Sequence, residues 1–196
     1  MKRRAVFLDR DGVINALVHR PREGLWDSPY TLEELQVLPG AGEAISQMRE
    51  LGFLALVVSN QPGVAKGQCT ETFLNLLTAY LQEELAHKGA SLDAVYYCLH
   101  HPHAVVEHYR LECACRKPRP GLLLQAARDH RIDLSESYLI GDRLVDVEAG
   151  KAVGCRTILV RSPASDLKDG ALNQPNRMCE DLLSAVLEIR ELEVRR

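Results

Sequence analysis

Short apolar runs alternate with stretches of helical periodicity along most of the 196-residue chain. The runs have the length and composition of buried parallel strands and lie at residues 5–9, 53–60, 94–98, 137–142 and 156–160. The remaining periodic stretches predict helices at about 41–51, 70–88, 120–130, 144–153 and 178–194. Strands that alternate with helices predict an α/β fold with a Rossmann-like parallel sheet flanked by helices on both faces.

The helix predicted at 70–88 has the clearest periodicity. Thr70 is suited to cap its start, and Gly89 is suited to end it. Its apolar face is predicted to consist of Phe73, Leu76, Leu77, Tyr80, Leu81 and Leu85.

Two segments do not follow the alternation of strands and helices. Residues 16–39 leave the end of the first strand directly, which makes them a candidate flap over a substrate. Residues 162–177 are polar and contain proline and glycine, a composition that predicts a solvated connection. There is no internal repeat or domain linker, so residues 1–196 are expected to form a single domain.

The charge balance argues against nucleic acid as a partner. Lysine and arginine number 24 against 27 aspartate and glutamate residues, and the net charge of -3 offers no broad basic face for a phosphate backbone. The apolar run before Asp9 is only four residues long, too short for a signal peptide or a membrane span. We therefore expect a cytoplasmic protein without a membrane partner. Its oligomeric state is left open, with a monomer favoured.

Polar residues stand where three of the predicted strands end, in the sequences Asp9-Arg10-Asp11, Ser59-Asn60-Gln61 and Gly141-Asp142. In a parallel sheet these ends meet at one edge, where ligands bind. Two aspartates separated by one residue can divide the work of phosphoryl transfer, since one attacks as a nucleophile while the other moves a proton. The pattern therefore points to a phosphomonoester as substrate.

The same edge has the composition of a magnesium site. Asp142 would complete a set of hard oxygen ligands, which Mg²⁺ prefers. The cation would offset the repulsion among the carboxylates and neutralise the phosphate, so that an anionic Asp9 can approach it. Ser59 and Lys117 would supply hydrogen-bond donors and positive charge to the phosphoryl oxygens.

A cluster of cysteine and histidine follows the third predicted strand. Cys98-x-His100 and Cys113-x-Cys115 supply three thiolates and one imidazole, which is the closed tetrahedral set of a structural zinc site. A disulfide is disfavoured, because a bond between Cys113 and Cys115 would close a very small, strained ring. The spacing is not that of a common nucleic-acid-binding finger, and no basic recognition helix follows.

Four histidines compete for the fourth zinc position: His100, His101, His103 and His108. His100 is preferred because its separation from Cys98 repeats that of Cys113 and Cys115. A zinc ion would fasten the loop at about 98–118 and so hold Lys117 within reach of the phosphate. The remaining cysteines stand alone and are expected to be packed or surface thiols: Cys69, Cys155 and Cys179.

Four segments resemble, in order, the motifs of haloacid dehalogenase superfamily phosphatases: "VFLDRDGVIN", "VVSNQPGVAKG", "CRKPRPG" and "YLIGDRLVDVEAG". The match spans about residues 4–161. Within that superfamily, the added cluster "CLHHP...CAC" resembles the D-glycero-D-manno-heptose 1,7-bisphosphate phosphatases and their relatives, the histidinol-phosphate phosphatases. The resemblance implies a small core without a large cap domain, in which short loops select the substrate.

The resemblance also implies roles for residues at matching positions. Asp9 would become an aspartyl-phosphate, and Asp11 would act first as general acid and then as general base. Asp9, the backbone carbonyl of Asp11, and Asp142 would hold magnesium. Further residues are expected to contact the substrate: Asn60, Gln61, Arg116 and Arg143.

The implied function is magnesium-dependent hydrolysis of a small phosphorylated metabolite, with the 7-phosphate of the heptose bisphosphate as first choice. A histidinol-phosphate phosphatase, or another small-metabolite phosphatase of the superfamily, is the alternative, and a non-catalytic, zinc-stabilised binding protein is a remote one. Two features depart from the resemblance: Val13 stands where threonine is common, and residues 16–30 look longer than the flap of the heptose enzymes. Trp26 in this flap either packs over a ligand or anchors the loop.

Overall fold

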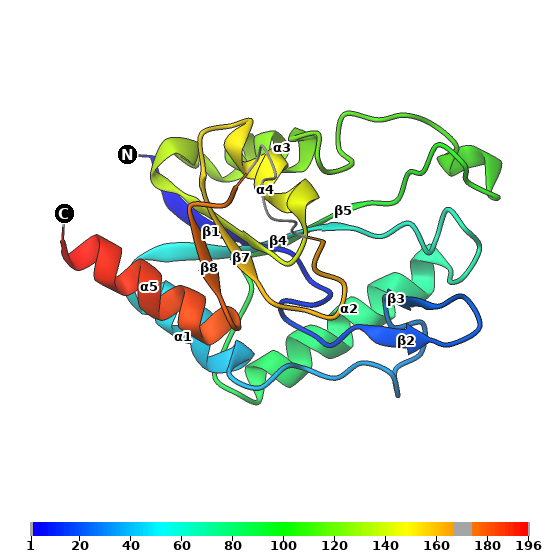
Figure 1. The fold of residues 1–196 in the computed structure, drawn as a ribbon, viewed down its shortest axis with the longest axis horizontal. Helices are drawn as coiled ribbons and strands as arrows, with labels where there is room; N and C mark the ends of the chain where they lie inside the picture. Colours follow the sequence, from blue (N-terminus) through cyan, green and yellow to red (C-terminus); the bar gives the residue numbers. More distant parts are fainter. Residues whose placement is uncertain (1, 167–173, 196) are drawn as a thin grey trace.

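A parallel sheet of six strands forms the centre of the computed structural model, which describes residues 2–166 and 174–195 (Figure 1). The strands are β1 (Arg4–Leu8), β4 (Phe53–Asn60), β5 (Ala94–Cys98), β6 (Tyr138–Gly141), β7 (Arg156–Val160) and β8 (Arg177–Cys179). Their order is β5-β4-β1-β6-β7-β8, and all neighbouring pairs are parallel. The five predicted strands and their Rossmann-like arrangement are confirmed.

Helices cover both faces of this sheet: α1 (Ala41–Glu50), α2 (Glu71–Ala86), α3 (Gly121–His130), α4 (Leu144–Lys151) and α5 (Leu182–Val194), with 3-10 helices at Glu107–Tyr109 and Leu134–Glu136. Figure 1 shows α1, α2 and α5 on one side and α3 and α4 on the other. Val6 and Leu8 of β1 belong to the hydrophobic cluster on the first side, whereas Ala5 and Phe7 belong to the second. Because successive side chains of a strand point to opposite faces, burial on both sides produces the unbroken apolar runs.

The ends of α2 lie close to the predicted positions. Thr70 Oγ1 accepts a hydrogen bond from Phe73 N at 3.0 Å, and Gly89, just beyond the helix, has a φ of 73°. The predicted apolar face is wrong in part, because Leu76 and Tyr80 are exposed. The buried side instead consists of Leu74, Leu77, Leu81 and Leu85.

The last helix begins later than predicted. Residues Arg177–Cys179 form the edge strand β8 and pair with β7. Asp181 then caps α5, since its Oδ1 accepts a hydrogen bond from Ser184 N at 2.8 Å. The helix predicted at 178–194 therefore starts at Leu182. Of the polar segment predicted at 162–177, residues 167–173 lie outside the described residues.

The predicted flap contains an antiparallel hairpin of β2 (Val18–Arg20) and β3 (Leu25–Asp27). Arg20 fastens the hairpin, because its guanidinium pairs with Glu34 and donates to the Ser28 carbonyl oxygen at 2.9 Å. Within the described part of the chain, no separate cap domain covers the sheet. No helix of that part is long and apolar enough to span a bilayer.

Candidate active site

A cavity of about 370 Å³ lies at the carboxyl edge of the sheet, where ligands are expected in this fold. Asp9 follows β1 directly, Ser59 and Asn60 end β4, and Asp142 follows β6. The cavity wall includes most of the predicted catalytic and substrate-binding residues: Asp9, Asp11, Ser59, Asn60, Arg116, Lys117, Asp142 and Arg143. The fold thus brings these residues together, while their individual roles stay predictions.

Three aspartates form an acidic group in this cavity. Carboxylate oxygens of Asp9, Asp142 and Asp146 lie within 4.8 Å of one another, and Asp142 Oδ1 is buried without a hydrogen-bond partner. Burial, with the charges of Asp9 and Asp146, raises the pKa of Asp142 to about 8. Burial also raises the pKa of Asp146, to about 6. A divalent cation between the carboxylates would offset this repulsion, so the group fits magnesium.

Lys117 is buried beside the acidic group, with three acceptors around its ammonium. Its Nζ lies 2.5 Å from Asp146 Oδ1 and 3.1 Å from Asp9 Oδ1, and it donates to the Val58 carbonyl oxygen at 2.8 Å. Burial alone would lower the pKa of Lys117, but the charges of Asp146 and Asp9 raise it above its ordinary value. Lys117 therefore stays a cation in contact with Asp9.

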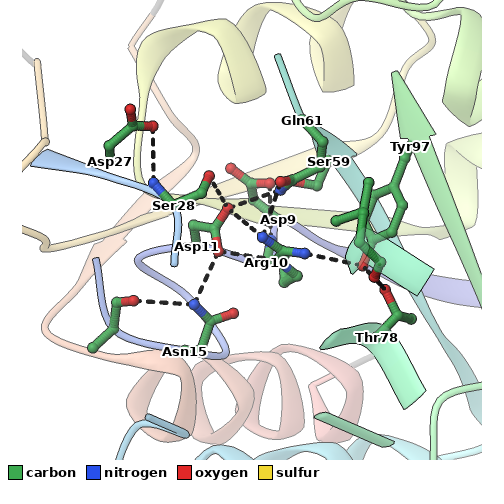
Figure 2. A network of polar contacts seen from close by, with 12 residues as sticks. Asp9, Arg10, Asp11, Asn15, Asp27, Ser28, Ser59, Gln61, Thr78 and Tyr97 are labelled. Carbon is green, nitrogen blue, oxygen red and sulfur yellow. Dashed lines mark hydrogen bonds and ion pairs between the residues drawn. The ribbon is translucent and has the colours of Figure 1, made fainter. Parts of the chain in front are cut away.

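Asp11 is held at the cavity wall by a network of hydrogen bonds (Figure 2). Its Oδ1 accepts from Arg10 Nε at 3.0 Å and from Asn15 Nδ2 at 2.9 Å. Its Oδ2 accepts from Arg10 Nη2 at 3.0 Å, Ser28 Oγ at 2.7 Å and Gln61 Nε2 at 2.8 Å. Burial favours the neutral acid, but the charge of Arg10 and the hydrogen bonds hold the pKa of Asp11 below its usual range. Asp11 is therefore an anion in this arrangement.

Gln61 lies within this network and is buried. Its Nε2 also donates to Ser59 Oγ at 3.1 Å, and its Oε1 accepts from Arg10 Nη2 at 2.9 Å. Arg10 extends the network toward β5, because its Nη1 donates to the Tyr97 hydroxyl at 3.4 Å (Figure 2). Gln61 thus orients Asp11 and Ser59, and its contact with a substrate stays a prediction.

The four predicted zinc ligands converge at the end of β5. Cys98 Sγ lies 3.5 Å from Cys113 Sγ and 3.3 Å from Cys115 Sγ, and the latter two sulfurs are 3.1 Å apart. His100 Nδ1 lies 3.4 Å from Cys115 Sγ, and none of the competing histidines joins the group. The sulfur separations are much longer than a disulfide bond of about 2.05 Å. Three thiolates and one imidazole around one point fit a structural zinc ion.

The two predicted arginines lie at the cavity. Arg116 follows Cys115 directly, lines the cavity and donates to the His100 carbonyl oxygen at 3.2 Å. Arg143 also lines the cavity, and its Nε lies 3.5 Å from Asp166 Oδ2. Both arginines therefore line the cavity that could hold a phosphorylated ligand.

Known proteins of similar sequence include phosphatases. A family model described as HAD-hydrolase-like matches residues 114–185. Over 192 residues, the chain is 37% identical to the D-glycero-beta-D-manno-heptose-1,7-bisphosphate 7-phosphatase of Photorhabdus laumondii, covering 95% of this chain and 97% of the relative. The chain belongs to the haloacid dehalogenase family of phosphatases. The Escherichia coli K12 protein of the same name is 39% identical over 161 residues, 81% of this phosphatase and 79% of the relative.

Solved structures of this family share the fold. The D,D-heptose 1,7-bisphosphate phosphatase of B. bronchiseptica, complexed with magnesium and phosphate, matches with a TM-score of 0.80 at 30% identity, over 96% of this chain and 99% of that one. The enzyme of that name from Burkholderia thailandensis matches with a TM-score of 0.69 at 27% identity, again over 96% and 99%. The predicted family and fold are confirmed.

The phosphatase has site residues that sequence reasoning did not find. Asp146 joins the acidic group, and its signal is a position four residues after Asp142, on the first turn of α4. Arg10 is fully buried and pairs with Asp11, a role that the sequence pattern of two aspartates around it does not indicate. Ser28 reaches Asp11 from the flap, whose path the apolar pattern does not predict.

The flap supplies part of the phosphatase cavity wall. Trp26 on β3 lines the cavity, is 41% exposed, and its ring centroid lies 4.8 Å from that of His19. Asp27 and Ser28 line the cavity as well. Trp26 therefore packs within the hairpin and also leaves surface for a ligand, which combines the two alternatives considered for it.

Proposed function

We propose that this phosphatase removes the 7-phosphate of D-glycero-D-manno-heptose 1,7-bisphosphate in a reaction that requires Mg²⁺. The observation that carries the proposal is the meeting of Asp9, Asp142 and Lys117 at one cavity, in a chain 37% and 39% identical to relatives of that name. The cavity volume of about 370 Å³ suits a small metabolite, since such sites span roughly 300–1,000 Å³.

Hydrolysis would proceed in two displacements at phosphorus. First, Asp9 attacks phosphorus, the bond from phosphorus to the sugar oxygen breaks, and Asp11 gives a proton to the leaving oxygen. Then a water molecule attacks the phosphorus of the aspartyl-phosphate while Asp11 takes a proton from it. Inorganic phosphate leaves, and both aspartates return to their starting forms.

Asp11 has to carry a proton before it can give one. Arg10, Asn15 and Gln61 present N–H groups to it, and these only donate. The Ser28 hydroxyl, 2.7 Å from Asp11 Oδ2, can turn from donor to acceptor. A protonated Oδ2 would therefore keep a partner in Ser28, which links the flap to the proposed acid.

Magnesium would be held by Asp9, the backbone carbonyl of Asp11, and Asp142. When bound, the ion supplies positive charge that neutralises the substrate phosphate and the carboxylates around it. Asp146 forms an ion pair with Lys117 instead, since its Oδ1 lies 2.5 Å from Lys117 Nζ. The ammonium of Lys117 partly neutralises the negative charge of Asp9. Together with Ser59, Lys117 is proposed to stabilise the phosphoryl oxygens.

The proposed zinc ion has a structural role. Four protein ligands leave no open position for a substrate or water, so the ion would hold the chain rather than take part in chemistry. The segment that this ion would hold ends at Cys115 and is followed directly by Arg116 and Lys117. Thiolates kept free for zinc suit a reducing compartment, which supports a cytoplasmic location.

A panel of phosphate esters tests the proposed function. Both anomers of the heptose bisphosphate, histidinol phosphate and other sugar phosphates are compared with and without Mg²⁺, and ³¹P NMR identifies the phosphate removed. We expect the highest kcat/KM for the heptose bisphosphate, and no turnover without Mg²⁺ or in Asp9→Asn. A higher kcat/KM for histidinol phosphate would contradict the substrate, and wild-type activity in Asp9→Asn would contradict the mechanism.

A further inference from the structure

The segment after β7 reaches back to the acidic group. Ser162 Oγ donates a hydrogen bond to Asp142 Oδ2 at 2.6 Å and accepts one from Ala164 N at 3.0 Å, so its proton is directed to the carboxylate. Asp166 Oδ1 accepts from Leu144 N at 2.8 Å, at the start of α4. Ser162 and Asp166 are thus tied to the site by hydrogen bonds, whereas Pro163 and Ser165 between them are exposed, as expected of a solvated connection.

The two oxygens of Asp142 have different surroundings. Oδ2 accepts the Ser162 hydroxyl and also lies against Gly12, where an added Cβ would clash with it. Oδ1 is buried and has no hydrogen-bond partner. A carboxylate held in this way has one oxygen engaged by the protein and the other free for a cation.

We propose that Ser162 is a positioning residue that fixes the Asp142 carboxylate, so that a single oxygen, Oδ1, is presented to the bound Mg²⁺. This inference rests on the proposed function, in which Asp142 is a magnesium ligand. Mg²⁺ demands near-ideal octahedral geometry, so a carboxylate that rotates or offers both oxygens is a poorer ligand. Partners that orient a metal ligand in this way typically contribute roughly 10- to 100-fold in metal affinity.

Hydrogen bonds between Ser162 and Ser165 stabilise the turn that contains them. Ser162 N donates to Ser165 Oγ at 2.9 Å, and Ser165 N donates to the Ser162 carbonyl oxygen at 3.2 Å. Ser165 Oγ also donates to the Val160 carbonyl oxygen at 3.4 Å. The Ser165 hydroxyl supports this turn and also lies 3.5 Å from Ser162 Oγ, whereas of the two hydroxyls it is that of Ser162 that donates to Asp142. Ser165 offers a matched control.

Calorimetric titration of the magnesium-free protein, with the proposed zinc site left loaded, tests the inference with Mg²⁺ alone and without a substrate. We expect Ser162→Ala to weaken Mg²⁺ binding by roughly 10- to 100-fold. Ser162→Thr keeps the hydroxyl and should retain most of the affinity, and Ser165→Ala should bind nearly as well as the wild type. In turnover assays, Ser162→Ala should need correspondingly more Mg²⁺ for half-maximal rate, with an unchanged KM for the phosphate ester at saturating Mg²⁺.

Wild-type affinity in Ser162→Ala, or an equal loss in Ser165→Ala, would overturn the positioning role. If circular dichroism shows that Ser162→Ala does not fold, Ser162→Cys, a weaker donor of similar size, makes the same comparison. Failure of the wild-type protein itself to bind Mg²⁺ would contradict the proposed function, and this outcome differs from failure of the Ser162 variants alone.

Discussion

Asn60 hydrogen-bonds both backbone groups of Lys117. Its Nδ2 donates to the Lys117 carbonyl oxygen at 3.1 Å, and its Oδ1 accepts from the Lys117 amide at 3.0 Å. The end of β4 thereby fixes a residue 57 positions away in sequence whose ammonium contacts Asp9. The proposed zinc ion would hold the same residue from the other direction along the chain.

Replacement of Asn60 by alanine should lower kcat. The loss of both hydrogen bonds lets Lys117 shift, and a displacement of about 1 Å can cost about 100-fold in rate. Steady-state kinetics measure the change, with Asn75→Ala on the exposed side of α2 as a matched control. A higher KM with an unchanged kcat would instead support the sequence-based expectation that Asn60 binds substrate.

The metal-free protein should lose stability as the pH rises from about 4 to about 8. Burial and the neighbouring carboxylates raise the pKa of Asp142 to about 8, whereas an unfolded aspartate titrates near 3.9. Between these values the native state binds more protons than the unfolded chain, so the free energy of unfolding falls by at most about 1.4 kcal/mol per pH unit from this group.

Urea unfolding in buffer without Mg²⁺ at several pH values measures this effect. The stability of the wild type relative to Asp142→Asn should decline across the window and flatten above about pH 8. Added Mg²⁺ should reduce the decline, because the cation replaces the proton as the partner of the carboxylate. Parallel pH profiles for the two proteins would show that Asp142 has no raised pKa.

Loss of the Arg10 charge should destabilise the fold strongly. The Arg10 side chain is fully buried and donates to both oxygens of Asp11. Arg10→Met leaves that carboxylate buried without a counter-charge, at an expected cost of about 3–5 kcal/mol in urea unfolding. Tyr97→Phe removes a hydroxyl that contacts Arg10 Nη1 and Thr78 Oγ1 and leaves the ion pair intact, so it should cost only about 1–2 kcal/mol.

The double variant Arg10→Met/Asp11→Asn separates charge from packing. If the cost in Arg10→Met comes from the unpaired carboxylate, the second substitution should restore much of the stability. An equally unstable double variant would mean that the loss comes from the volume of the arginine in the core.

Loss of the proposed zinc ion should greatly reduce activity and leave the acidic group in place. A Cys113→Ser/Cys115→Ser variant should lose bound zinc, measured by elemental analysis, and most of its phosphatase activity, because the segment before Lys117 is no longer held. Its affinity for Mg²⁺ should change far less. Cys69→Ser, at a cysteine outside the zinc group, is the control. A folded, zinc-free and fully active variant would contradict the coupling.

Much of the fold could be predicted because strands buried on both faces of the sheet consist of consecutive apolar residues. Five of the six strands of the central sheet come from largely apolar runs, and the ends of three of them located Asp9, Ser59 and Asp142 without knowledge of the loops. The edge strand β8 could not be found in this way, because two of its three residues are exposed and carry no apolar pattern. On α2, apolar residues on both the buried and the exposed sides obscured which side packs.

The contacts that complete the site depend on loop paths, which periodicity does not encode. Ser28 meets Asp11 because the chain after β3 returns to the loop that follows β1, and Ser162 meets Asp142 because a turn follows β7. Both serines lie in polar segments where a serine is ordinary. Asp146 differs from these serines, because its position four residues after Asp142 can be seen in the sequence. The sequence does not indicate that it pairs with Lys117.

Trp26 is the single tryptophan of the chain, and it stands in the wall of the cavity. Its fluorescence therefore reports on the active site alone, without background from other indole rings. Emission recorded in a stopped-flow instrument can follow the arrival of a phosphate ester, and its departure as products, on an unlabelled enzyme. The flap thus gives this phosphatase an intrinsic optical signal for the order and speed of its binding steps.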